Sequence, residues 1–149
     1  MTDSLVRRRD AAQQILDAWK ARPLRLGTND CVRMIAAHLR KLGYKVKLPP
    51  SGSYRTVASA TKALRAAGFS SVGAALDDLG LERIAPAAAI IGDILELPAV
   101  DGLGAFAIAL GNGRAAAYHE DVAGGVQVIQ PLEYVDAWRA PPRSKVVSP

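Results

Sequence analysis

The stretch that decides the fold spans residues 26–43 and reads LGTNDCVRMIAAHLRKLG. After the cysteine, apolar residues recur at spacings of three and four, which predicts an amphipathic helix over roughly residues 29–42. Thr28 or Asn29 can cap this helix, because a side-chain oxygen there accepts a hydrogen bond from an N–H group of the first turn. The sequence therefore predicts that Cys31, the only cysteine of the chain, lies in the first helical turn.

This position gives Cys31 a particular chemical environment. The first turn of a helix presents unpaired backbone N–H groups and the positive end of the dipole, which Asp30 complements, while Gly43 can close the other end. Such surroundings favour the thiolate that a nucleophilic cysteine needs. A lone cysteine is also often a small buried residue, so a core role for Cys31 stays open.

Length and composition indicate one domain with a substantial core. The chain has 149 residues, of which 50% are hydrophobic, and two short tails are expected at about residues 1–8 and 141–149. A single cysteine excludes an internal disulfide and a zinc site built from several thiolates. Neither a signal peptide nor an apolar run of about 18 residues is found. We therefore expect a soluble protein, made in the cytoplasm, with no membrane span.

The charge balance is basic, with a formal net charge of +5 and a sequence pI of about 9.7. The positive residues are nevertheless scattered, and aromatic residues make up only 5% of the chain, so no surface for stacking nucleic-acid bases is expected. Arg7–Arg9 and the later Arg139, Arg143 and Lys145 are expected to be solvated ends, or arms that dock on an acidic neighbour.

The remaining pattern divides the chain into helices followed by strands. Helical spacing predicts further helices over residues 5–21, 56–67 and 71–79. Alternation then predicts strands over residues 90–97, 104–110, 114–119 and 125–129, with a reversal of the chain at Asn112-Gly113. Residues 132–139 are expected to form a helical turn followed by a last short strand. This order predicts an α+β domain in which N-terminal helices pack on a C-terminal antiparallel sheet.

Three short motifs stand out along the chain: Asn29-Asp30-Cys31, Gly92-Asp93-Ile94 and the run of residues 108–113 that ends in Leu-Gly-Asn-Gly. They resemble motifs of the small papain-like cell-wall peptidases of the NlpC type. The chain is more similar still to a branch encoded among the tail-tip genes of tailed phages, which shares the segments Tyr54-Arg55-Thr56, Gly125-Val126 and Ala137-Trp138-Arg139. The resemblance covers roughly residues 10–140. It implies a single NlpC-like domain over residues 1–149.

One departure from that family concerns its catalytic histidine. NlpC-type enzymes carry this residue at the start of the strand that leads to the Leu-Gly-Asn-Gly turn. Counted back from the turn, this chain has Gly104, Ala105 or Phe106 there, and none of these side chains can accept a proton. The base that the resemblance implies for Cys31 is therefore missing from its expected place.

The chain's two histidines are the remaining candidates for a base. His38 follows Cys31 by seven residues on one predicted helix, about 10 Å along the axis, and is expected to be a half-buried helical residue. His119 ends a predicted strand beside Glu120 and Asp121, and a neighbouring strand could bring it near Cys31. His119 can equally belong to an ordinary exposed loop, so both interpretations of it stay open.

The resemblance implies two functions. The favoured one is a structural component of a phage tail tip with weak or no peptidase activity, bound to other tail-tip or hub proteins and located in the virion. The alternative is a peptidoglycan endopeptidase that opens the cell wall during DNA delivery, with Cys31 as nucleophile and His119 as base. The paired acids Asp77-Asp78 and Glu120-Asp121 lack the spacing of metal ligands, and no cofactor is expected.

Overall fold

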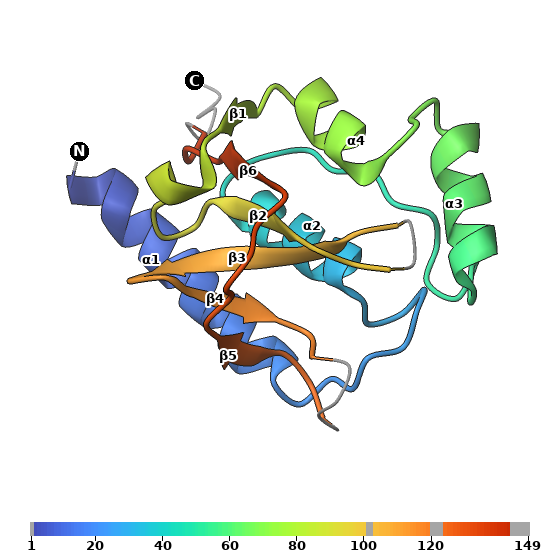
Figure 1. The fold of residues 1–149 in the computed structure, drawn as a ribbon, viewed down its shortest axis with the longest axis horizontal. Helices are drawn as coiled ribbons and strands as arrows, with labels where there is room; N and C mark the ends of the chain where they lie inside the picture. Colours follow the sequence, from blue (N-terminus) through green and yellow to red (C-terminus); the bar gives the residue numbers. More distant parts are fainter. Residues whose placement is uncertain (1, 101–102, 120–123, 144–149) are drawn as a thin grey trace, which may run out of the picture.

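Helices fill the first half of the chain, and strands fill the second half (Figure 1). The computed structural model describes residues 2–100, 103–119 and 124–143. Its helices are α1 (Thr2–Trp19), α2 (Cys31–Lys41), α3 (Val57–Ala66) and α4 (Val72–Asp78). They are followed by β1 (Glu82–Ile84), the 3-10 turn η1 (Pro86–Ala88), β2 (Ile94–Leu97), β3 (Ala105–Gly111), β4 (Arg114–Ala117), β5 (Gln127–Ile129) and β6 (Asp136–Arg139). The predicted α+β class is confirmed.

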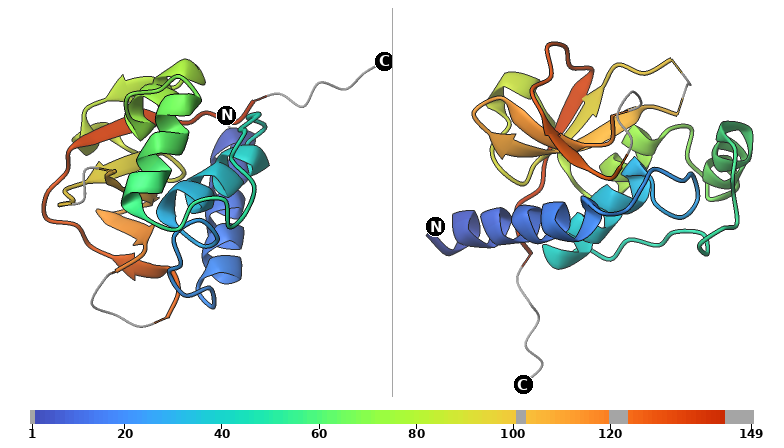
Figure 2. Two further views of the ribbon diagram at one scale, coloured as in Figure 1. Left: turned by 90° about the vertical axis from the view of Figure 1, so that its right-hand side faces the viewer. Right: turned by 90° about the horizontal axis from the view of Figure 1, so that it is seen from below.

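The strands form one antiparallel sheet in the order β1-β6-β2-β3-β4-β5. The last strand therefore lies inside the sheet, between β1 and β2. To reach this place the chain leaves the β5 edge and crosses the outer face of the sheet, opposite α1 and α2 (Figures 1 and 2). We call residues 130–135 the crossing segment. The backbone N–H of Val135 donates to the carbonyl of Glu96 at 2.8 Å, which anchors the end of the segment to β2.

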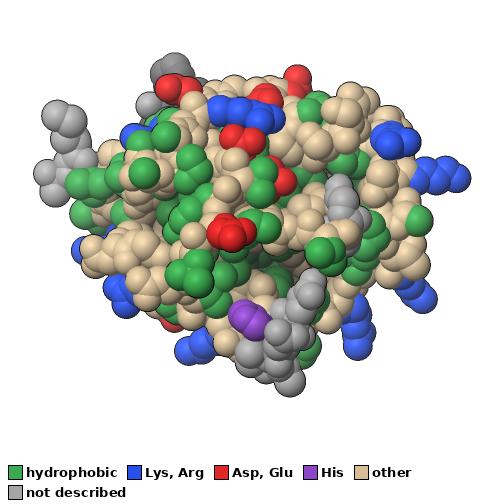
Figure 3. Space-filling view, viewed as in Figure 1, with side chains coloured by type: hydrophobic (Ala, Val, Ile, Leu, Met, Phe, Trp, Pro, Cys, Tyr) green, Lys and Arg blue, Asp and Glu red, His purple; other side chains and the backbone are tan. Residues whose placement is uncertain are grey.

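The two faces of the sheet differ in side-chain size. Large residues such as Phe106, Ile108 and Trp138 pack against α1 and α2 in the main core. The outer face is built mainly of alanines on β3, β4 and β6, together with Leu95 of β2. In the crossing segment, Leu132 is 95% exposed and Val135 is 52% exposed. Hydrophobic side chains are accordingly visible on this face in Figure 3.

The predicted hairpin at Asn112-Gly113 is confirmed. Both residues have positive φ, 54° and 75°, as a tight type I′ reversal between β3 and β4 requires. The helices predicted over residues 56–67 and 71–79 appear as α3 and α4. Three details were wrong. The strand predicted over residues 90–97 begins only at Ile94, because a turn occupies residues 91–92. The exit segment has no helical turn before β6, and β1 was not predicted, because a three-residue strand carries too little pattern to be recognised.

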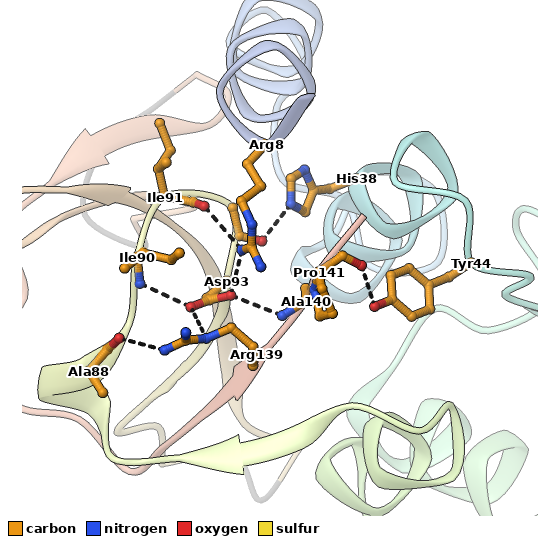
Figure 4. Close-up of polar contacts among 11 residues, drawn as sticks. Arg8, His38, Tyr44, Ala88, Ile90, Ile91, Asp93, Arg139, Ala140 and Pro141 are labelled. Atoms are coloured by element: carbon orange, nitrogen blue, oxygen red, sulfur yellow. Dashed lines mark hydrogen bonds and ion pairs between the residues drawn. The ribbon is translucent and has the colours of Figure 1, made fainter. Parts of the chain in front are cut away.

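A buried carboxylate joins the first helix to the last strand (Figure 4). Asp93, in the turn before β2, is fully buried and accepts hydrogen bonds from the backbone N–H groups of Ile90 and Ala140, each at 2.9 Å. The guanidinium groups of Arg8 on α1 and Arg139 on β6 pair with its two oxygens at 2.9 and 3.0 Å. Four partners thus offset the cost of burying this charge.

The basic ends are only partly the solvated segments that the sequence predicted. Helix α1 begins at Thr2, so residues 2–8 are helical, and Arg8 is only 4% exposed, whereas Arg9 is 64% exposed. Arg143 is exposed but donates to the carbonyl of Leu79 at 2.7 Å. These intramolecular partners were not predicted, because they lie far along the chain. Lys145 falls outside the described residues.

Candidate active site

Cys31 is the first residue of α2, as predicted, but its cap differs from the prediction. The N-cap is Asp30, whose extended backbone (φ −137°, ψ 172°) lets its Oδ1 accept the N–H of Arg33 at 2.8 Å. Thr28 and Asn29 form the turn before it. At the other end Gly43 has a φ of 97°, and its N–H bonds back to the helix, so the predicted glycine closure is confirmed.

Asp30 also fixes the loop that precedes the cysteine. Its second oxygen accepts the N–H of Gly27 and the hydroxyl of Tyr54, both at 2.9 Å, and the side chain is 2% exposed. Gly27 has a φ of 90°, and a Cβ there would collide with the carbonyl oxygen of Tyr54, so only glycine fits. Burial, followed by the neighbouring Asp30, raises the pKa of Tyr54 to about 12, which keeps its hydroxyl a donor. Hydrogen bonds from Gly27, Arg33 and Tyr54 to Asp30 therefore fix the turn that precedes Cys31.

Replacement of Asp30 by alanine is expected to lower the free energy of unfolding by about 2 kcal/mol, since a cap is lost and buried donors lose their acceptor. Asp30→Asn keeps an oxygen for the Arg33 N–H and should cost clearly less. Urea denaturation of both variants measures the difference. Asn29→Ala, one residue earlier, is the matched control, and equal losses in Asp30→Ala and Asn29→Ala would contradict the capping role.

Cys31 and His119 line the same cleft, which has a volume of about 510 Å³. Its walls come from the loop before α2, the start of α3, the β2–β3 connection and the end of β4, and Figure 3 shows a hollow ringed by hydrophobic side chains on this side of the molecule. Clefts of this size, mostly apolar with a few convergent polar groups, are typical of ligand sites. The two site residues named from the sequence are thus brought to one cleft from α2 and from the end of β4.

The cleft wall opposite the helix start includes Gly104, Ala105 and Phe106. Ala105 opens β3, paired with Leu97 of β2. These are the positions where the NlpC resemblance leads one to expect a histidine. They lie on the wall of the Cys31 cleft and carry no group that can accept a proton.

Tyr118 also lines this cleft, and it was not predicted from the sequence as a site residue. Its hydroxyl donates to the carbonyl of Arg22 at 3.0 Å. Burial, with smaller contributions from Asp30 and Cys31, raises its pKa to about 12. Tyr118 therefore stays protonated at neutral pH and does not serve as a base. Its position next to His119 was the only signal in the sequence.

His38 lies away from the cleft. It is fully buried, not half-buried as predicted, and its Nε2 donates to the carbonyl of Gly92 at 2.8 Å. Asp77 of the first acidic pair accepts hydrogen bonds from Arg83 and from the indole of Trp138, whereas Glu120 and Asp121 fall outside the described residues. Within the described ranges no group of three or more His, Cys, Asp or Glu residues could hold a metal ion.

Comparison with known proteins gives a family without an assigned activity. No curated protein matches this chain in sequence. Among the helices of the described residues, none is both long and apolar enough to cross a membrane. One family, described as a domain of unknown function (DUF6950), matches residues 5–140. This match covers the whole sheet, every helix except the first three residues of α1, and all the residues that line the Cys31 cleft, and the chain belongs to the DUF6950 family.

Proposed function

We propose that this chain is a structural component of a phage tail tip that retains an NlpC-like domain with weak or no peptidase activity. The observation that carries the proposal is the cleft wall beside Cys31, where Gly104, Ala105 and Phe106 stand in place of a base. A positioned general base contributes about 10²–10⁴-fold to the rate of such reactions. The tail-tip role and the virion location rest on the resemblance of the sequence motifs to tail-tip proteins.

A second candidate is a cysteine peptidase that cleaves peptidoglycan. It is favoured by the shared cleft of Cys31 and His119. In this reaction His119 takes the proton of the Cys31 thiol, and the sulfur attacks the peptide carbonyl. The backbone N–H of Cys31, in the first turn of α2, contributes to stabilising the oxyanion. His119 then returns the proton to the leaving amine, and water hydrolyses the thioester.

Incubation of the purified protein with purified peptidoglycan separates the two candidates. Peptide release is measured by mass spectrometry for the wild type, Cys31→Ala and His119→Gln. We expect all three to release equally little, because no base lies at the start of β3. If release by the wild type is abolished in Cys31→Ala and falls about 10²–10⁴-fold in His119→Gln, the peptidase assignment is correct and the inactive one is wrong. An active cell-wall peptidase serves as the positive control for the substrate.

The tail-tip role is tested separately in phage particles. Particles carrying Cys31→Ala are expected to assemble and infect like the parent, whereas deletion of the whole protein is expected to block completion of the tail tip. Electron microscopy of tails and plaque counts measure both effects. Normal tails after deletion of the protein would rule out the structural role.

A further inference from the structure

A second hollow lies among α2, α3 and α4, next to the Cys31 cleft, with which it shares Leu103 as a lining residue. It has a volume of about 140 Å³ and is lined almost entirely by apolar side chains. One wall is the face of α2 that carries Val32, Ile35 and Leu39, and the opposite walls come from α3 and α4. We call it the α3 cavity.

The α3 cavity is open because the residues facing α2 are small. Ala60 and Ala63 on α3 and Ala75 on α4 line it, where larger side chains would fill the space. Of the ten residues of α3, only Ala60 is buried. An apolar cavity of about 150 Å³ stays dry and takes up a six-carbon ligand such as benzene. The volume and the lining therefore both suit an apolar group of about six carbons.

The rim of the cavity supplies a positive charge on a fixed loop. Lys47 is exposed and lines the cavity, and no ion pair found among the described residues involves it. The loop around it is tied to α2, since Arg40 donates to the carbonyl of Val46 at 2.7 Å and Arg33 donates to that of Pro49 at 2.7 Å. Lys47 is thus held where it can meet an anionic group at the rim.

We propose that the α3 cavity binds a small amphiphile, an unbranched chain of about six carbons whose carboxylate pairs with Lys47. The chain fills the apolar interior, and the carboxylate remains at the surface. Cys31 is not among the residues that line this cavity, so the proposal does not depend on whether the protein is a peptidase.

Titration with hexanoate, followed by backbone amide shifts in NMR spectra, tests the site. We expect saturable binding with a dissociation constant of roughly 1 mM, as burial of about six carbons predicts, and shifts confined to α2, α3, α4 and the loop around Lys47. Hexylammonium, which has the same chain and the opposite charge, should bind more weakly. The absence of saturable hexanoate shifts in the wild type would overturn the proposal.

Matched variants locate the ligand. Ala63→Leu fills the cavity and should weaken hexanoate binding at least about tenfold, whereas Ala66→Leu, on the exposed side of the same helix, should not change it. Lys47→Gln should weaken hexanoate but not hexanol, and Lys45→Gln should affect neither. If Ala63→Leu does not fold, Ala75→Leu on α4 tests the same point. Equal binding by the filled variant and the wild type would place the ligand elsewhere, and an unchanged affinity in Lys47→Gln would refute the carboxylate pairing.

Discussion

Replacement of Asp93 by alanine is expected to lower the free energy of unfolding by about 3–5 kcal/mol, the usual cost of leaving one partner of a buried ion pair uncompensated. Asp93 is fully buried, and Arg8 is only 4% exposed. Without the carboxylate, the Arg8 guanidinium keeps a positive charge in the interior, and the N–H groups of Ile90 and Ala140 lose their acceptor. Denaturation in urea at pH 7 measures the loss.

The same helix provides a control for this prediction. Arg9 and Asp10 form an ion pair of 3.2 Å, but the two side chains are 64% and 52% exposed. Solvent screens such pairs, so Asp10→Ala is expected to cost less than about 1 kcal/mol. An Asp93→Ala variant no less stable than Asp10→Ala would mean that Asp93 does not hold the fold together.

Acidification is expected to destabilise the protein through His38, by about 3 kcal/mol between pH 6.5 and pH 4. Burial lowers the pKa of His38 from 6.5 to about 4, against the opposing effect of its hydrogen bond to Gly92. In this range the unfolded chain binds a proton at His38 that the folded protein does not bind. The contribution of His38 to the free energy of unfolding is therefore fully present above pH 6.5 and is lost as the pH falls toward 4. The charges that face the ring are Arg8 and Lys41, which oppose its protonation, and Asp93, which favours it.

The contribution of His38 is isolated by comparing variants. His38→Gln removes the titrating group. Between pH 6.5 and pH 4 the unfolding free energy of this variant should therefore fall by about 3 kcal/mol less than that of the wild type. Parallel pH profiles for the wild type and His38→Gln would show that His38 is not the group responsible.

The parts of the fold that the sequence predicted correctly depend on local signals. Cys31 was placed in the first turn of α2 because a cap residue, an apolar repeat and a closing glycine occur within one short stretch. The hairpin was found because Asn112-Gly113 tolerates positive φ. In both cases the residues that determine the structure are neighbours in the chain.

The parts that were missed depend on pairing between distant residues. Arg8 gave no sign of its partner, since Asp93 lies 85 residues later. The placement of β6 inside the sheet could not be read from its own four residues. Likewise, Cys31 and His119 share a cleft because of the way α2 packs on the sheet, and no local sequence pattern determines that packing. For the candidate site, the sequence identified these two residues but gave no role there to Tyr54, which donates to Asp30, or to Tyr118, which lines the cleft.

The position of β6 has a consequence for the order in which the chain folds during synthesis. A ribosome delivers β1 and β2 long before the strand that lies between them, so until β6 emerges both have an unpaired edge. Arg8 and Asp93 also lack the cover that Arg139 and Ala140 later provide. Pairing of such distant segments is slow, and unpaired strand edges promote aggregation. The nascent chain therefore completes its sheet only after β6 has emerged from the ribosome, and until then its unpaired strand edges can pair with other chains.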